Sequence, residues 1–171
     1  MTTTAKEYGE GLYELARDEH VLEQVHGEVL ELSEILKAEP RGVLAVLGDG
    51  GYPYAVPLDF VYKDGKLYFH SAMEGHKVDA LKACDKASFC VMDKGEPVEG
   101  DWALWFNSVI CFGRMRLVEG QAETIAIARD LGLKYYPSEQ DVEDEIKKDG
   151  HRVLCMELTI EHMTGKHVHE K

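Results

Sequence analysis

The sequence has few of the cysteines that stabilise small secreted proteins, and it lacks the long apolar runs that cross membranes. Its 171 residues include only four cysteines, without a C-x-x-C pair, so neither a disulfide framework nor a metal site is predicted. No apolar run approaches the length of a membrane-spanning helix, and the opening segment lacks the apolar core of a signal peptide. These absences predict a cytoplasmic protein that does not enter a membrane.

Basic residues are also scarce. Nineteen Lys and Arg stand against 32 Asp and Glu, which gives a formal net charge of −13. Binding to a phosphate backbone needs a basic surface, so nucleic acid is not an expected partner, and an anionic membrane surface is disfavoured for the same reason. A phosphorylated cofactor would need a local positive pocket set against this overall field.

The hydrophobic periodicity changes at Pro40. The segment 4–39 has apolar residues at helical spacing and is predicted to form a helix that breaks near 18–20. From Gly42 onward the period is that of strands. About six antiparallel strands, with one inserted helix and others at the periphery, predict a small closed or partly closed β-barrel. The predicted parts are an N-terminal helical extension (1–40), a barrel domain (41–166) and a polar tail (167–171).

The same hydrophobic periodicity, together with turn and cap residues, predicts the individual strands and helices of the barrel. The predicted strands are 43–47, 54–62, 67–70, 87–92, 102–118 with a break near Gly113, and 152–160 followed by polar residues. The predicted helices are 75–84, 124–136 and a short one that Ser138 caps and that ends near Gly150.

The segment 64–77 carries the main functional signal. A hairpin turn at Asp64-Gly65 precedes a short strand, and the alternation stops at Ser71, where helical spacing takes over. A hydroxyl, backbone N–H groups and Lys77 therefore converge where a helix begins. This arrangement suits a phosphate, because first-turn amides have no intrahelical acceptor. A solvated turn that carries a chance lysine remains open as the alternative.

Four motifs, in order along the chain, resemble one family. The resemblance covers roughly 35–166 and is to the FMN-binding split barrels related to pyridoxamine 5′-phosphate oxidase, most closely the nitroimidazole-resistance (Nim-type) branch. It implies a mainly β protein with peripheral helices, a six-stranded antiparallel split barrel that forms a homodimer with FMN at the subunit interface. The motifs are PYAVPLDFVYKDGKLYFHSAMEGHKVDAL, SFCVMD, FNSVICFGRMRLVEG and IEHMTGK.

The resemblance also implies the residues around FMN. One strand would run beside the isoalloxazine ring, the turn after the next strand would hold the phosphate, and a later strand and a lysine would approach the flavin. His70 is the candidate catalytic residue, with a half-buried histidine bonded to backbone as the alternative. The implied cofactor-binding residues are Val56, Pro57, Leu58 and Asp59 at the ring, His70, Ser71, Ala72, His76 and Lys77 at the phosphate, and Asn107, Ser108 and Lys166 near the flavin.

The chain departs from related sequences where a substrate would bind. It lacks the arginine-rich segments and the terminal R-L-x-P-type motif of pyridoxamine phosphate oxidases, so that activity is not expected. Phe106 and Asn107 stand where a tyrosine and a basic residue are usual. The expected function is FMN-dependent reduction of a small oxidant such as a nitroaromatic, with a reduced nicotinamide (NADH or NADPH) or a small redox protein as donor. A non-catalytic flavin- or haem-binding redox protein is the alternative.

Overall fold

A computed structural model describes the backbone of residues 22–100, 102 and 104–168, and within these ranges the side chains from residue 29 onward. Contacts divide the chain into two units, 1–34 and 35–171. Helix α2 (Leu22–Ala38) ends two residues before Pro40, as the sequence predicts. The predicted break near 18–20 lies outside the described residues.

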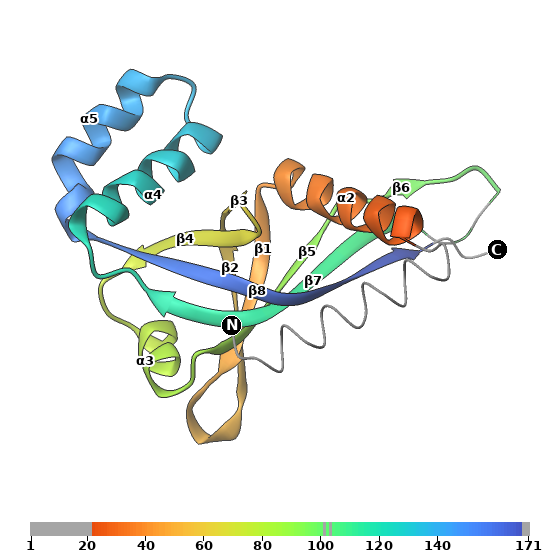
Figure 1. Cartoon of the computed structure of the whole chain (residues 1–171), viewed down its shortest axis with the longest axis horizontal. Helices are drawn as coiled ribbons and strands as arrows, with labels where there is room; N and C mark the ends of the chain where they lie inside the picture. The colour runs from red at the N-terminus through yellow and green to blue at the C-terminus, as the bar shows by residue number, and fades with distance from the viewer. Residues whose placement is uncertain (1–21, 101, 103, 169–171) are drawn as a thin grey trace. The chain divides into compact units, whose positions relative to one another are not determined.

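The second unit is built on one antiparallel sheet that curls into a half-barrel (Figure 1). The strand order is β2-β1-β5-β7-β8-β4-β3, and β6 pairs with β7 beside this path. The predicted fold class is therefore confirmed. The strands are β1 (Arg41–Leu47), β2 (Pro53–Asp59), β3 (Val61–Lys63), β4 (Lys66–Ala72), β5 (Lys86–Met92), β6 (Glu96–Pro97), β7 (Leu104–Leu117) and β8 (Val153–Val168), and the helices are α3 (His76–Ala83), α4 (Gln121–Tyr135) and α5 (Glu139–Asp149).

The seam of the half-barrel lies at Phe60. The sequence predicts a single strand over 54–62, and this is wrong: β2 and β3 are separate strands at opposite edges of the sheet. Phe60, which lies between them, is fully buried, and its N–H donates to the Tyr135 hydroxyl at 3.0 Å. Because this amide bonds to a side chain of α4, strand pairing stops here and the barrel stays split.

The inner face of the sheet carries the main core. Strands β1, β4 and β5 alternate buried and more exposed residues, as expected for a sheet packed on one side. The ring of Phe89 meets the rings of Phe60 and Phe69 edge-on, each with centroids 4.9 Å apart. A second, smaller cluster packs α4 on the outer face and contains Val118, Ile127, Leu131 and Cys155.

The two longest strands, β7 and β8, run side by side (Figure 1). Their register shifts between Phe112 and Gly113, so the predicted break is an irregularity within one continuous strand. A side chain at Gly113 would overlap the carbonyl oxygen of Thr159, which explains the glycine. The predicted end of the last strand at Ile160 is wrong, because β8 stays paired with β7 to the end of the strand.

The local turn chemistry follows the sequence. Asp64 and Gly65 have φ angles of 52° and 75°, which is the backbone of the hairpin turn that the sequence predicts. Strand β4 runs on to Ala72, past the predicted end of its alternation. The Ser138 hydroxyl accepts the Asp141 N–H at 3.2 Å and caps α5, as predicted. In the described part of the chain, no helix has the length and apolar character of a membrane span.

Candidate functional site

The start of α3 offers backbone donors. The amides of Val78 and Asp79 donate to the carbonyl oxygen of Gly75, at 2.9 and 3.1 Å, and so form the first intrahelical bonds. Gly75 has a φ of 131°, a conformation that favours glycine. The amides of His76 and Lys77 come before these bonds and have no acceptor within the helix. Lys77 lies in the first turn of α3, as predicted, and is half-buried.

Ser71 carries a buried hydroxyl near the end of β4, a few residues before α3 along the chain. It is 9% exposed and lies on the inner face of β4 with Leu67 and Phe69. Its Oγ has no hydrogen-bond partner among the residues that the structure describes. Ser71 does not cap α3, whose N-cap is Gly75. A buried hydroxyl without a partner costs about 1–3 kcal/mol, so a ligand that accepts this hydrogen bond would relieve a real penalty.

His76 lies against the β1–β2 connection. Its ring centroid is 4.4 Å from that of Tyr54, and its Nδ1 is 3.8 Å from a carboxylate oxygen of Asp49. The Asp49 carboxylate is exposed, so water screens its charge. The contact brings the connection between β1 and β2 beside the first turn of α3.

His70 faces away from this site. Successive residues of a strand point to opposite faces, so the exposed side chains of His70 and Ala72 lie across β4 from Ser71. The three predicted phosphate residues that lie on β4 are therefore divided between two faces of the sheet. Within the described ranges, the His70 ring makes no hydrogen bond or ion pair, so the alternative of a half-buried histidine bonded to backbone does not hold.

His70 instead lines a cavity of about 460 Å³ together with α4 and α5. Asp59, at the end of β2, lines it as well and accepts a hydrogen bond from the Arg41 guanidinium at 2.6 Å. Sequence reasoning missed the helical side of this cavity. A signal was present in α5, where carboxylates and apolar residues recur at helical spacing. The further lining residues are Ala128, Leu131, Gly132, Tyr135, Tyr136, Val142, Glu145, Ile146, Asp149, Gly150 and Val153.

Three residues predicted near the flavin share the outer face of the sheet. Pro57 lies in β2, an edge strand, which is where a proline within a sheet is tolerated. In the strand registers Ser108 stands opposite Lys166, and the pairings across β1, β5 and β7 place Pro57 on the same face. Val56 and Leu58 alternate with Pro57, point to the inner face and are half-buried.

Asn107 is already engaged within the protein. Its Nδ2 donates to an Asp93 carboxylate oxygen at 2.8 Å, and its backbone N–H donates to the other oxygen at 3.1 Å. Its Oδ1 lies 2.5 Å from Nδ1 of His167. These bonds fix the amide of Asn107 in a network between β7 and β8, on the face opposite to Ser108.

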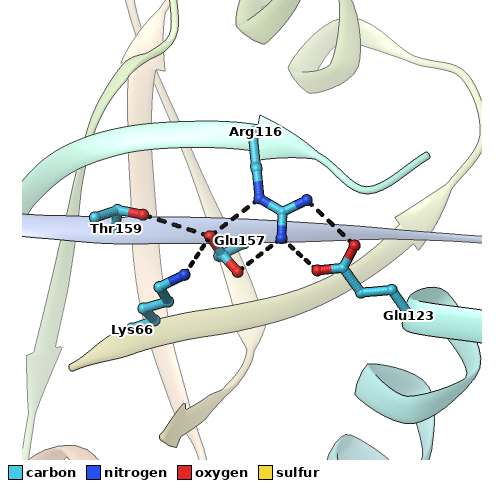
Figure 2. Close-up of polar contacts among 5 residues, drawn as sticks. All are labelled: Lys66, Arg116, Glu123, Glu157 and Thr159. Carbon is cyan, nitrogen blue, oxygen red and sulfur yellow. Dashed lines mark hydrogen bonds and ion pairs between the residues drawn. The ribbon is translucent and has the colours of Figure 1, made fainter. Parts of the chain in front are cut away.

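The pKa of the Glu157 carboxyl group is lowered far below its ordinary value, and Figure 2 shows the bonds that cause this shift. Its carboxylate is 3% exposed and accepts two hydrogen bonds from Arg116, at 3.0 and 2.9 Å, and one from Lys66 at 2.9 Å. The Arg116 bonds, with help from Lys66, lower the pKa of Glu157 to about 2. Glu123 also pairs with Arg116. Because each charged group in this cluster has an oppositely charged partner, we infer that the cluster stabilises the fold.

The comparisons with known proteins agree with this geometry. The family model for pyridoxamine 5′-phosphate oxidase matches residues 28–167. No curated protein matches. Among solved structures, a candidate 5-nitroimidazole antibiotic resistance protein from Bacteroides thetaiotaomicron superposes with a TM-score of 0.68 and 20% identity, over 80% of this chain and 81% of that one.

Two further similar structures are those of flavin-binding proteins. The FAD- and heme-binding protein from Mycobacterium smegmatis has a TM-score of 0.67 and 18% identity, over 82% of this chain and 71% of that one. A FAD-binding protein from Mesorhizobium loti has a TM-score of 0.58 and 23% identity, over 82% and 94%. At these identities the structures establish the fold alone. Through the family model, the chain belongs to the pyridoxamine 5′-phosphate oxidase-like split-barrel family, whose members typically bind FMN or FAD.

Proposed function

We propose that this chain binds FMN and holds the phosphate at the start of α3. The observation that carries the proposal is the buried Ser71 hydroxyl, which has no partner in the described part of the protein and precedes the helix by a few residues. The first-turn amides and the Lys77 ammonium group complete a set of donors that matches a phosphate. A cation in the first turn of a helix is disfavoured unless an anion lies nearby.

The proposed ring site follows the edge of the sheet. Edge strand β2 presents backbone N–H and C=O groups that no strand in the described ranges uses, and these can bind the polar edge of a flavin ring. Lys166, on the same face as Pro57 and Ser108, would supply positive charge near that ring. When bound, FMN supplies redox chemistry that amino-acid side chains do not, and the protein contributes binding, orientation and electrostatics.

The proposal includes a homodimer. The outer face of β1, β5 and β7 exposes large apolar side chains: Met92 is 52% exposed, and Val43 and Phe112 are 37% exposed each. The strand registers place these residues on the face that carries Pro57 and Ser108. A second copy that packs on this face would bury the apolar residues and enclose a flavin bound beside them.

We propose reduction of a small oxidant as the activity, with a nitroaromatic as the first candidate and NADH or NADPH as donor. The fold similarity to the candidate 5-nitroimidazole resistance protein supports this choice of oxidant. The described chain adds no second nucleotide-binding domain to the barrel, so donor and acceptor would use the same flavin face in turn. His70 remains a candidate for substrate contact.

The test is spectroscopic. The absorption spectrum of the purified protein is recorded first, followed by an FMN titration monitored by flavin fluorescence. NADH or NADPH is then added without oxygen, and a 5-nitroimidazole after it. We expect two flavin bands, in the blue and the near ultraviolet, that the nicotinamide bleaches and the nitro compound restores. Protein that is colourless and leaves FMN fluorescence unchanged would rule the proposal out.

Haem binding is the second candidate. The similar structure from Mycobacterium smegmatis is described as binding both FAD and heme. His70 is exposed and has no protein partner among the described residues, so its imidazole could coordinate an iron. An intense Soret band in place of the flavin bands would favour this candidate, and His70→Ala should then abolish the band.

A further inference from the structure

The cavity beside His70 is not explained by the proposed phosphate site. It lies against β4 and between helices α4 and α5, while Ser71 points to the other face of the same strand. Its volume of about 460 Å³ falls within the range of small-molecule pockets, roughly 300–1,000 Å³. The cavity is therefore large enough for a ligand of its own.

One side of the cavity is apolar. Leu131 of α4 and Val142 of α5 are buried, and Ile146 and Val153 are partly buried beside them. The helices approach closely at Gly132, where an added Cβ would lie 2.7 Å from a methyl carbon of Val142. Because the two helices pack this closely, the apolar wall between them is rigid. It can pack against the flat or branched apolar body of a small molecule.

The charged groups of the cavity are acidic. Asp59, Glu145 and Asp149 line it, and none of the described lining residues is a lysine or an arginine. A phosphate or carboxylate would meet three like charges here, whereas a cation would be attracted. The formal net charge of −13 adds to this preference.

Basic residues do reach these carboxylates from outside the cavity. Arg41 bonds to Asp59 at 2.6 Å, Lys148 lies 3.4 Å from Glu145 and 3.1 Å from Asp149, and Arg152 lies 3.6 Å from Asp149. These three basic side chains are largely exposed to solvent, where such pairs contribute little energy and rearrange easily. A ligand ammonium group could therefore replace Lys148 without a large cost.

We infer that this cavity binds a small organic cation, an amine carried on an aromatic or branched apolar body. The apolar body lies against the α4–α5 wall, and the ammonium group meets Glu145 and Asp149. The His70 imidazole and the Tyr136 ring bound the same space. Flavin is not required for this binding, so the inference stands or falls separately from the proposed function.

The first test compares three indole compounds of similar size by isothermal titration calorimetry with the full-length protein. Tryptamine is the cation, tryptophol replaces the amine by a hydroxyl, and indole-3-acetate carries a negative charge. We expect tryptamine to bind at least about tenfold more tightly than tryptophol, and indole-3-acetate to be weakest. Equal affinities for the three, or no binding of tryptamine at millimolar concentration, would overturn the inference.

The second test uses variants of α5. Glu145→Gln should lower tryptamine affinity about tenfold and leave tryptophol affinity unchanged, because only the charge is removed. Asp144→Asn is the matched control: it lies on the same helix, outside the cavity, and should change neither affinity. Tryptamine affinity that is unchanged in Glu145→Gln, or lowered equally in the control, would contradict the inference.

A third variant fills the cavity. Ala128→Phe places an aromatic ring in the lining and should abolish binding of tryptamine and tryptophol alike. Circular dichroism checks that this variant is folded. Because Glu145 is exposed and its variant should fold normally, the inference remains testable even if Ala128→Phe unfolds. Full tryptamine binding in a folded Ala128→Phe protein would place the ligand elsewhere.

Discussion

The Tyr135 hydroxyl uses both backbone hydrogen-bonding groups of Phe60. It accepts from the Phe60 N–H at 3.0 Å, lies 2.9 Å from the Phe60 carbonyl oxygen, and also contacts the carbonyl oxygen of Pro40. The neighbouring Lys134 ammonium group donates to the same Phe60 oxygen at 3.1 Å and lies 4.3 Å from the centroid of the Phe60 ring. The end of α4 thus holds the seam between β2 and β3 in place.

Tyr135→Phe should therefore destabilise the barrel. The substitution leaves the Phe60 amide without its partner in a buried position, and we expect a loss of about 1–2 kcal/mol in the free energy of unfolding. Urea denaturation measures it. Tyr136→Phe is the control, because the Tyr136 hydroxyl has no hydrogen bond within the described chain. Equal stability of the two variants would show that Tyr135 does not hold the seam.

The seam also shows what the sequence could not predict. Phe60 follows strand-like residues and looks like one more of them, because its break is made by a tyrosine 75 residues away. The sequence could not predict the end of β8 for a related reason. Its last residues are polar and mostly exposed, so no burial pattern marks them, and only their pairing with β7 makes them a strand.

Other features were available from local chemistry. Asp64-Gly65 predicted the hairpin and Ser138 predicted the start of α5, because turn and cap preferences depend on neighbouring residues alone. The division between His70 and Ser71 could also have been predicted, since adjacent residues of a strand point to opposite faces. It was missed because the alternation was expected to stop at Ser71.

The Glu157 cluster predicts an acid-dependent loss of stability. Its pKa in the folded protein is about 2, below the ordinary value of 4.5, so the unfolded chain takes up the proton first as the pH falls. Stability from this group is complete above about pH 4.5 and is lost as the pH falls toward 2. Figure 2 shows the bonds to Arg116 and Lys66 that cause the shift.

Glu157→Gln should cost about 3 kcal/mol at pH 7, because Arg116 and Lys66 lose their shared buried partner. The variant should approach the parent protein in stability between pH 4.5 and 2. Glu161→Gln is the matched control on the same strand, since that carboxylate is exposed and pairs with Arg114. Urea unfolding across this pH range measures both. A constant difference between Glu157→Gln and the parent would refute the assignment of the pH dependence.

Phe112→Asp tests the proposed dimer. The substitution places a charge in the exposed apolar face of β7, where a second copy would have to desolvate it. We expect light scattering after size-exclusion chromatography to change from the mass of a dimer to that of a monomer. Leu133→Asp, on α4 and similarly exposed, should leave the mass unchanged. A parent protein that is already monomeric would exclude the dimer.

Ser71→Ala separates ligand binding from folding. Without flavin, removal of a buried hydroxyl that lacks a partner should raise the free energy of unfolding by up to about 1 kcal/mol. With flavin, the lost donor should weaken FMN binding about tenfold. A purely structural serine would not change stability and affinity in opposite directions, so this pair of measurements identifies a phosphate donor.

Lys77→Ala should weaken FMN binding further, and more strongly at low salt, because the interaction is between charges. Lys82→Ala, an exposed lysine in the last turn of the same helix, is the control for the change in net charge. Riboflavin, which lacks the phosphate, should bind Lys77→Ala and the parent protein equally. Equal losses for riboflavin and FMN would instead place Lys77 at the ring, and unchanged FMN affinity in Ser71→Ala and Lys77→Ala together would remove the proposed phosphate site.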